Sequence, residues 1–159
     1  MSQTNARADD DAFAEALAAA GRLNRALSPL RINEEWAQER LRSALRRPEH
    51  AVQAIFLLET LDTEPTKALV DDLVKYALRE RHTLLIRNLL GRLPWREAKE
   101  IVPPAVGRLL DDADDSDDYR RMAELLYHLG LDEALQELCA RAEDSIDPDV
   151  REVAADFGR

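Results

Sequence analysis

One apolar pattern recurs along this chain and limits the folds that it can adopt. Three segments align over their whole length: HAVQAIFLLETL from His50, HTLLIRNLLGRL from His82 and DYRRMAELLYHL from Asp118. Each contains two adjacent leucines and a third leucine three residues later, with the elements starting at residues 57, 89 and 125, which gives spacings of 32 and 36 residues. A truncated fourth copy begins at Asp149. Repetition at such a period is typical of stacked helix pairs.

Composition and spacing predict helices throughout. The chain has 5 Gly, 3 Phe and 3 Tyr among 159 residues, and Ala, Leu, Arg and Glu dominate, which favours helix over strand. Residues 1–8 are predicted to be a disordered tail, and residues 9–159 a single helical-repeat domain. The expected helices cover about residues 11–28, 34–45, 49–61, 64–77, 81–93, 95–110, 117–129, 131–142 and 148–157.

Proline, capping and leucine positions make these expectations specific. The first helix is expected to end near Ser28-Pro29, and Asn33 to cap the next one. Pro103-Pro104 should kink or split the helix that contains it. Leu57 and Leu89 lie in nearly all-apolar second helices, so both are predicted to be core residues.

The last copy contains Asp147-Pro148-Asp149-Val150-Arg151-Glu152-Val153-Ala154-Ala155, which resembles the second helix of a HEAT repeat. The resemblance covers the pattern of about residues 33–157. It implies a right-handed α-solenoid of about four HEAT-like helical hairpins plus an N-terminal helix, an all-α fold. It also implies that Asp149 caps its helix, that Arg151 reaches the neighbouring repeat, and that the two valines and Ala154 pack inward. Solenoid folds have many functions, so the resemblance itself predicts no chemistry.

Charge is distributed unevenly along the sequence. Residues 111–159 hold 16 acids and 5 bases, whereas residues 1–110 hold 16 acids and 17 bases. A basic block within the first part has eight bases against three acids: Lys75, Arg79, Arg81, Arg87, Arg92, Arg96, Lys99 and Arg108. The protein is therefore expected to be electrically polarised.

A run of six aspartates in eight residues precedes one second helix, from Asp111 to Asp118. Taken as a calcium loop from Asp112, it lacks glycine at its sixth position and glutamate at its twelfth, so we expect no metal site there. Electrostatic contact with a partner, or a solvated loop, are the remaining interpretations. Asp117 and Asp118 also suit the positive start of the following helix.

The second helices of a solenoid normally line its concave face, so their polar positions are the predicted partner-binding residues. These residues, with the aspartate run beside them, are Arg87, Arg92, Arg120, Arg121, His128, Asp111, Asp112, Asp114, Asp115, Asp117 and Asp118.

Other features bear on location and chemistry. One cysteine excludes an internal disulfide and suits a reducing compartment, and we find no signal peptide or apolar run of membrane length. A cytoplasmic protein is expected. The sequence contains no catalytic, cofactor or metal motif, so we expect no enzyme activity, cofactor or bound metal.

The sequence therefore predicts a non-enzymatic module, an adaptor or an immunity-type inhibitor, that binds another protein through a charge-polarised repeat surface. Two alternatives remain open. The basic middle repeats could bind nucleic acid, although a pI near 4.8 makes nucleic acid an improbable partner. The aspartate run could instead mimic nucleic acid. The oligomeric state is not predicted.

Overall fold

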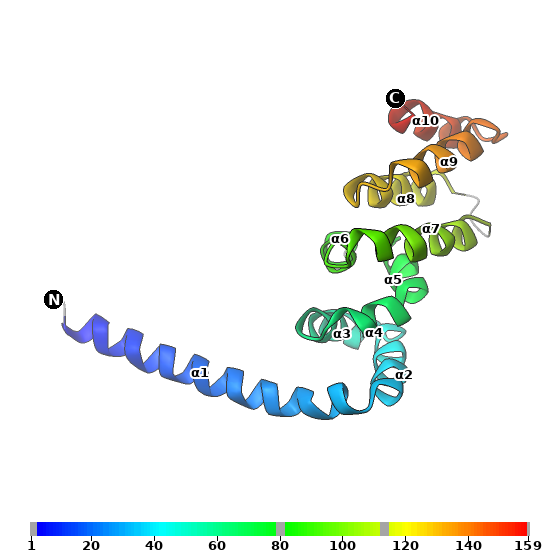
Figure 1. Ribbon diagram of the computed structural model, residues 1–159. Coiled ribbons are helices and arrows are strands. Elements are labelled where there is room, and N and C mark those ends of the chain that lie inside the picture. Colours follow the sequence, from blue (N-terminus) through cyan, green and yellow to red (C-terminus); the bar gives the residue numbers. More distant parts are fainter. Residues whose placement is uncertain (1–2, 79–81, 112–114, 159) are drawn as a thin grey trace. The chain divides into compact units, whose positions relative to one another are not determined.

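The computed structural model describes residues 3–78, 82–111 and 115–158, with side chains from residue 9 onward. Over these residues the chain forms ten helices and no strand, which confirms the all-α class (Figure 1). The helices are α1 (Gln3–Ile32), α2 (Glu34–Leu45), α3 (Pro48–Thr60), α4 (Thr63–Ala68), α5 (Val70–Ala77), α6 (Thr83–Leu90), α7 (Trp95–Asp111), α8 (Ser116–His128), α9 (Asp132–Glu143) and α10 (Pro148–Phe157). Contacts divide the chain into two units, Met1–Glu39 and Arg40–Arg159.

The first unit is dominated by α1, which is longer than predicted at both ends. It begins at Gln3, within the segment expected to be a tail, and it continues through Pro29 to Ile32. A proline near a helix end removes one donor, but its carbonyl still accepts: the Asn33 amide lies 3.1 Å from the Pro29 oxygen. The predicted Asn33 cap is confirmed, because Trp36 N donates to Asn33 Oδ1 at 3.2 Å.

The second unit consists of packed helix pairs in the predicted order. The first helices of successive pairs contact each other where α5 meets α7, and the second helices do so where α3 meets α6, α6 meets α8 and α8 meets α10. Within pairs, α5 packs on α6, α7 on α8 and α9 on α10. Each helix therefore covers part of its partner and part of the next pair.

Two helices in this unit differ from the prediction. The helix expected over residues 64–77 is two helices, because Leu69 leaves helical geometry at φ −112° and ψ 12°. The prolines in the middle of α7 do not split it. Val102, Ala105 and Val106 are buried around them, and this packing holds the helix together where two amide donors are missing.

The HEAT-like segment agrees with only some of the expectations that the resemblance implies. Val150, Val153 and Ala154 are buried. The cap is Asp147 rather than Asp149, since Asp147 Oδ1 accepts from the Asp149 amide at 2.9 Å. Among the described residues, the hydrogen bonds of Arg151 go to its own hairpin rather than to a neighbouring repeat. Its Nη1 bonds the carbonyl oxygens of Ser145 and Ile146, at 2.7 and 3.0 Å, in the loop before its own helix.

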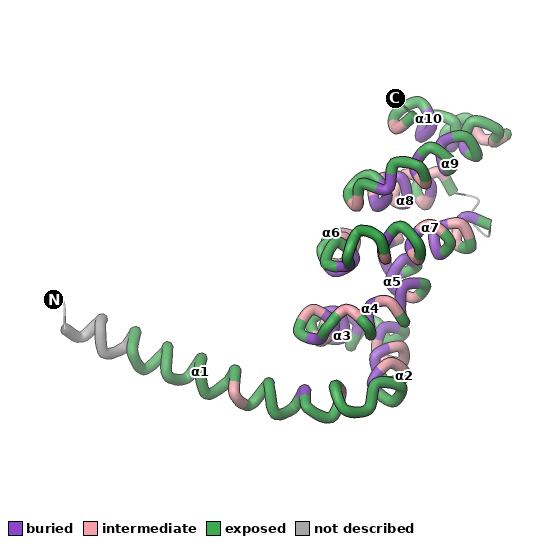
Figure 2. Tube along the Cα trace, viewed as in Figure 1, coloured by how far each residue is buried: buried purple, intermediate pink, exposed green. Residues whose placement is uncertain are grey.

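The repeated leucines supply the core of the second unit (Figure 2). Leu58, Leu89, Leu90, Leu125 and Leu126 are all at most 1% exposed. Leu89 is a core residue as predicted. Leu57 was wrongly predicted to be one: it is half-buried, and its neighbour Leu58 occupies the buried position. An apolar run places hydrophobic residues on every side of a helix, so the sequence alone does not fix which of two adjacent leucines points inward.

We predict that Leu58→Ala and Leu89→Ala each lower the free energy of unfolding by about 2–5 kcal/mol, because each removes a fully buried side chain. The control is Leu84→Ala in the same helix as Leu89; Leu84 is 65% exposed, and its truncation should change stability by under about 0.5 kcal/mol. Urea denaturation measures all three. Equal effects at Leu84 and Leu89 would contradict the observed burial.

Candidate functional site

Four of the predicted partner-binding residues line one groove between α6 and α8. The groove has a volume of about 340 Å³ and is lined by Thr83, Leu84, Arg87, Asp117, Arg120, Arg121 and Glu124. The α8 residues share a face because they recur at helical intervals of three and four. We refer to these seven residues as the α6–α8 groove.

Arg87 makes an ion pair within the groove. Its Nη2 forms an ion pair with Glu124 of α8, and its side chain is only 19% exposed. Its buried Nε has no hydrogen-bond partner in the described part of the chain. Arg87 therefore joins α6 to α8 in addition to lining the surface.

Two of the other predicted arginines, Arg92 and Arg120, also make contacts between helix pairs. Arg120 Nη1 lies 2.7 Å from Asp156 Oδ2 of α10. Arg92 bonds two carbonyl oxygens at the end of α3, those of Glu59 and Leu61. Partners in these contacts lie 31 to 37 residues away in sequence, which is about one repeat.

Three arginines of this kind satisfy the exposed carbonyls at helix C-termini. Arg42 bonds the Ala68 oxygen at the end of α4, Arg92 the end of α3, and Arg141 the Leu110 oxygen at the end of α7. The last four carbonyls of a helix have no partner within it, and a guanidinium supplies several donors. We call these three residues the arginine caps.

The basic block is largely matched by internal acceptors. Besides Arg87 and Arg92, Lys99 pairs with Glu133 at 2.9 Å and Arg108 with Asp71 at 2.5 Å. Arg79 and Arg81 lie outside the described residues. Counting bases along the sequence thus overstates the positive charge that this region presents.

The aspartates have several different structural roles. Asp111 accepts from Arg141 at 2.7 Å, and Asp115 caps α8 by accepting from the Asp117 amide at 2.9 Å. Asp117 and Asp118 occupy the first turn of α8, as predicted. The predicted residues Asp112 and Asp114 lie outside the described part. Among the described residues, no three His, Cys, Asp or Glu side chains are grouped so that they could hold a metal ion.

The carboxyl of Asp118 has a raised pKa. Burial raises its pKa above the ordinary value, the nearby carboxylates of Asp115 and Asp117 raise it further, and Arg121 opposes them. The pKa of the Cys139 thiol is also raised, by burial and by Glu143, so this side chain is a protonated packing residue.

The sequence interpretation missed three exposed apolar side chains on second helices. Phe56 of α3 is 54% exposed, Leu84 of α6 65% and Tyr127 of α8 70%. Tyr127 contacts Phe157 edge to face, with ring centroids 6.5 Å apart, and the predicted His128 beside it is exposed. Phe56 and Leu84 lie in apolar runs, where the pattern gives no signal for the residue that faces outward.

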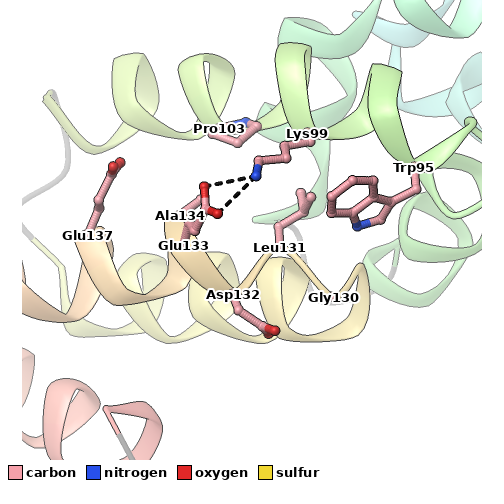
Figure 3. Close-up of a pocket in the computed structure, with 9 residues that line it drawn as sticks. All are labelled: Trp95, Lys99, Pro103, Gly130, Leu131, Asp132, Glu133, Ala134 and Glu137. Carbon is pink, nitrogen blue, oxygen red and sulfur yellow. Dashed lines mark hydrogen bonds and ion pairs between the residues drawn. The ribbon is translucent and has the colours of Figure 1, made fainter.

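A second groove between α7 and α9 was also not predicted (Figure 3). It has a volume of about 260 Å³, and Trp95, which is 56% exposed, forms one end. Lys99 Nζ lies 5.3 Å from the Trp95 ring centroid and pairs with Glu133 across the groove. The spacing of Trp95 and Lys99 by one helical turn is the sequence signal that could have found this contact.

No protein-family model, curated protein or solved structure matches the chain. No helix among the residues that the structure describes is both long and apolar enough to cross a membrane.

We predict that Arg87→Glu destabilises the protein, because it places a carboxylate beside Glu124. The expected loss is about 1–2 kcal/mol, less than for a fully buried pair because Glu124 is 42% exposed. The double variant Arg87→Glu, Glu124→Arg should recover at least half of this loss in urea denaturation. Additive losses would show that the two side chains do not interact.

The raised pKa of Asp118 gives a pH-dependent prediction. A carboxyl whose pKa is higher in the folded than in the unfolded chain stabilises the fold while protonated, and this contribution disappears as pH rises through the folded pKa. Asp118→Asn should therefore raise the melting temperature at neutral pH, with the gain shrinking as pH falls through the raised pKa of the folded state and absent below the ordinary aspartate range. A lower melting temperature at neutral pH would mean that attraction to the start of α8 outweighs burial.

Proposed function

We propose that the chain is a HEAT-like α-solenoid that binds another protein and has no catalytic activity of its own. Support comes from the sequence repeats and from the order of helix contacts, in which α5 packs on α7, and α3, α6, α8 and α10 pack in series. A right-handed stack of about four hairpins is the arrangement that we infer from this order. The single cysteine is buried, and a cytoplasmic location suits an unpaired thiol.

The observation that carries this proposal is the exposed apolar residue on each of three consecutive second helices. Phe56 and Tyr127 are exposed on α3 and α8, and Leu84 is exposed on α6, where it lines the α6–α8 groove beside charged side chains. Aromatic and large apolar anchors with a charged rim are typical of protein interfaces. We infer that these three residues are the anchors, and that the groove residues set the register.

The charge distribution favours a partner with a basic surface. Much of the middle positive charge is already paired internally, whereas α9 and α10 present exposed carboxylates. Glu133 and Asp156 are paired with Lys99 and Arg120, and the other exposed carboxylates of these helices are Asp132, Glu137, Glu143, Asp149 and Glu152. Electrostatic attraction of this kind chiefly accelerates association and fixes orientation. An adaptor or an immunity-type inhibitor fits these properties.

Internal pairing also weighs against the nucleic-acid alternative. Phosphate binding requires bases that release counterions on contact, and Arg87, Arg92 and Arg108 are each engaged by acceptors of the same chain. The acidic-mimic alternative keeps support from the exposed carboxylates, and its partner would likewise be a basic protein.

We predict that Leu84→Asp with Tyr127→Asp abolishes partner binding and keeps the fold. Affinity capture from native lysate, quantified by mass spectrometry, compares this variant with wild type. The matched control is Trp95→Asp with Ile146→Asp, which changes two side chains that are 56% and 98% exposed outside this surface. The proposal requires proteins that wild type and control capture and the surface variant loses.

Other results of the same experiment would contradict the proposal. Equal capture by all three proteins would place the contact elsewhere. Salt-dependent binding of duplex DNA by the purified protein would support the nucleic-acid alternative. Capture of DNA-binding proteins that duplex DNA competes away would support the acidic mimic.

A further inference from the structure

The N-terminal helix α1 has an apolar face that is largely uncovered. Phe13, Leu17 and Leu23 are 66%, 59% and 44% exposed, and Figure 2 shows most of α1 in the colour of exposed residues. These side chains recur at helical spacing and form one stripe with Ala16 and Ala20. Apolar stripes of this kind are stable in water only when another surface covers them.

The charges of α1 are segregated along its length. Its segment 9–15 holds four acids and no base, namely Asp9, Asp10, Asp11 and Glu15. The segment 22–31 holds three bases and no acid, namely Arg22, Arg25 and Arg31. The two ends of this helix are therefore complementary to each other in charge.

We propose that α1 pairs with α1 of a second copy of this chain in an antiparallel orientation. That orientation sets the acidic end of each helix against the basic end of the other, whereas a parallel pair would bring like charges together. The charge pattern therefore indicates that the apolar stripe is covered by α1 of another copy, running in the opposite direction.

Helical positions give the pairing a consistent register. When Phe13 of one copy lies against Leu23 of the other, Leu17 lies near Ala20. At 100° per residue, Phe13, Leu17 and Ala20 lie within about 60° of one another around α1, so a two-fold axis brings the two stripes together. The alanines let the backbones approach closely at the centre.

Light scattering on the full-length protein over a range of concentrations tests the stripe. We expect a dimer of twice the 18.0 kDa chain mass. Phe13→Asp with Leu17→Asp should weaken dimerisation by at least about tenfold, a change of about 1.4 kcal/mol. The matched control, Ala14→Asp with Ala18→Asp, adds the same charges to the opposite face of α1 and should leave the dimer intact. Circular dichroism checks that both variants keep their helix content.

Charge variants test the orientation. Asp9, Asp10 and Asp11→Arg should weaken self-association, and so should Arg22 with Arg25→Glu, because each makes both ends of α1 alike in charge. Mixing the two variants should restore a dimer. A wild-type dimer no stronger than either variant alone would contradict antiparallel pairing.

Three results would overturn the proposal. One is a wild-type protein that stays monomeric at high micromolar concentration, which would mean that α1 is covered by its own chain or not at all. Another is a dimer that survives the Phe13 and Leu17 substitutions, because its contact would lie elsewhere. A third is an equal loss of dimer in the stripe variant and in its control, which would show that dimerisation does not depend on the apolar face of α1.

Discussion

Helices that are apolar on most sides are stable in water only when other helices cover them. This requirement determines how the helices of the second unit pack. Ile55 and Leu58 of α3, and Leu89 of α6, are fully buried because α3 packs against α6, and α6 also packs against its partner α5 and against α8. Leu125 and Leu126 of α8 repeat the arrangement. The groove, the exposed anchors and the charged contacts all depend on this packing, because it fixes which faces of the second helices remain in solvent.

Local signals predicted much of the fold. The Asn33 cap and the two aspartates in the first turn of α8 each act on adjacent backbone groups, so a single sequence contains the necessary information. The same holds for helix order and for the leucine core as a whole. Features decided by tertiary packing were missed. They include the choice between Leu57 and Leu58 and the break at Leu69.

The candidate site was less predictable than the fold because charge in sequence differs from charge at the surface. Arg87, Arg92 and Arg120 were expected to face a partner, and the structure joins each to an acceptor about one repeat away. Arg87, Asp117, Arg120 and Arg121 nevertheless meet in one groove, because they are polar positions of the neighbouring helices α6 and α8. The exposed apolar residues Phe56, Leu84 and Tyr127 were not predicted, because a sequence does not show which apolar side chains of a helix point into solvent.

The arginine caps have a consequence for how such a protein can change over time. Arg92 and Arg141 bind carbonyl oxygens, which every residue type provides, so these bonds place no requirement on the side chains of the helix end that they contact. A neighbouring pair can therefore drift in sequence, or be replaced by another hairpin of the same length, while the bond across the boundary persists. A protein built in this way can gain or lose a helix pair without new side-chain contacts having to evolve at each boundary between pairs.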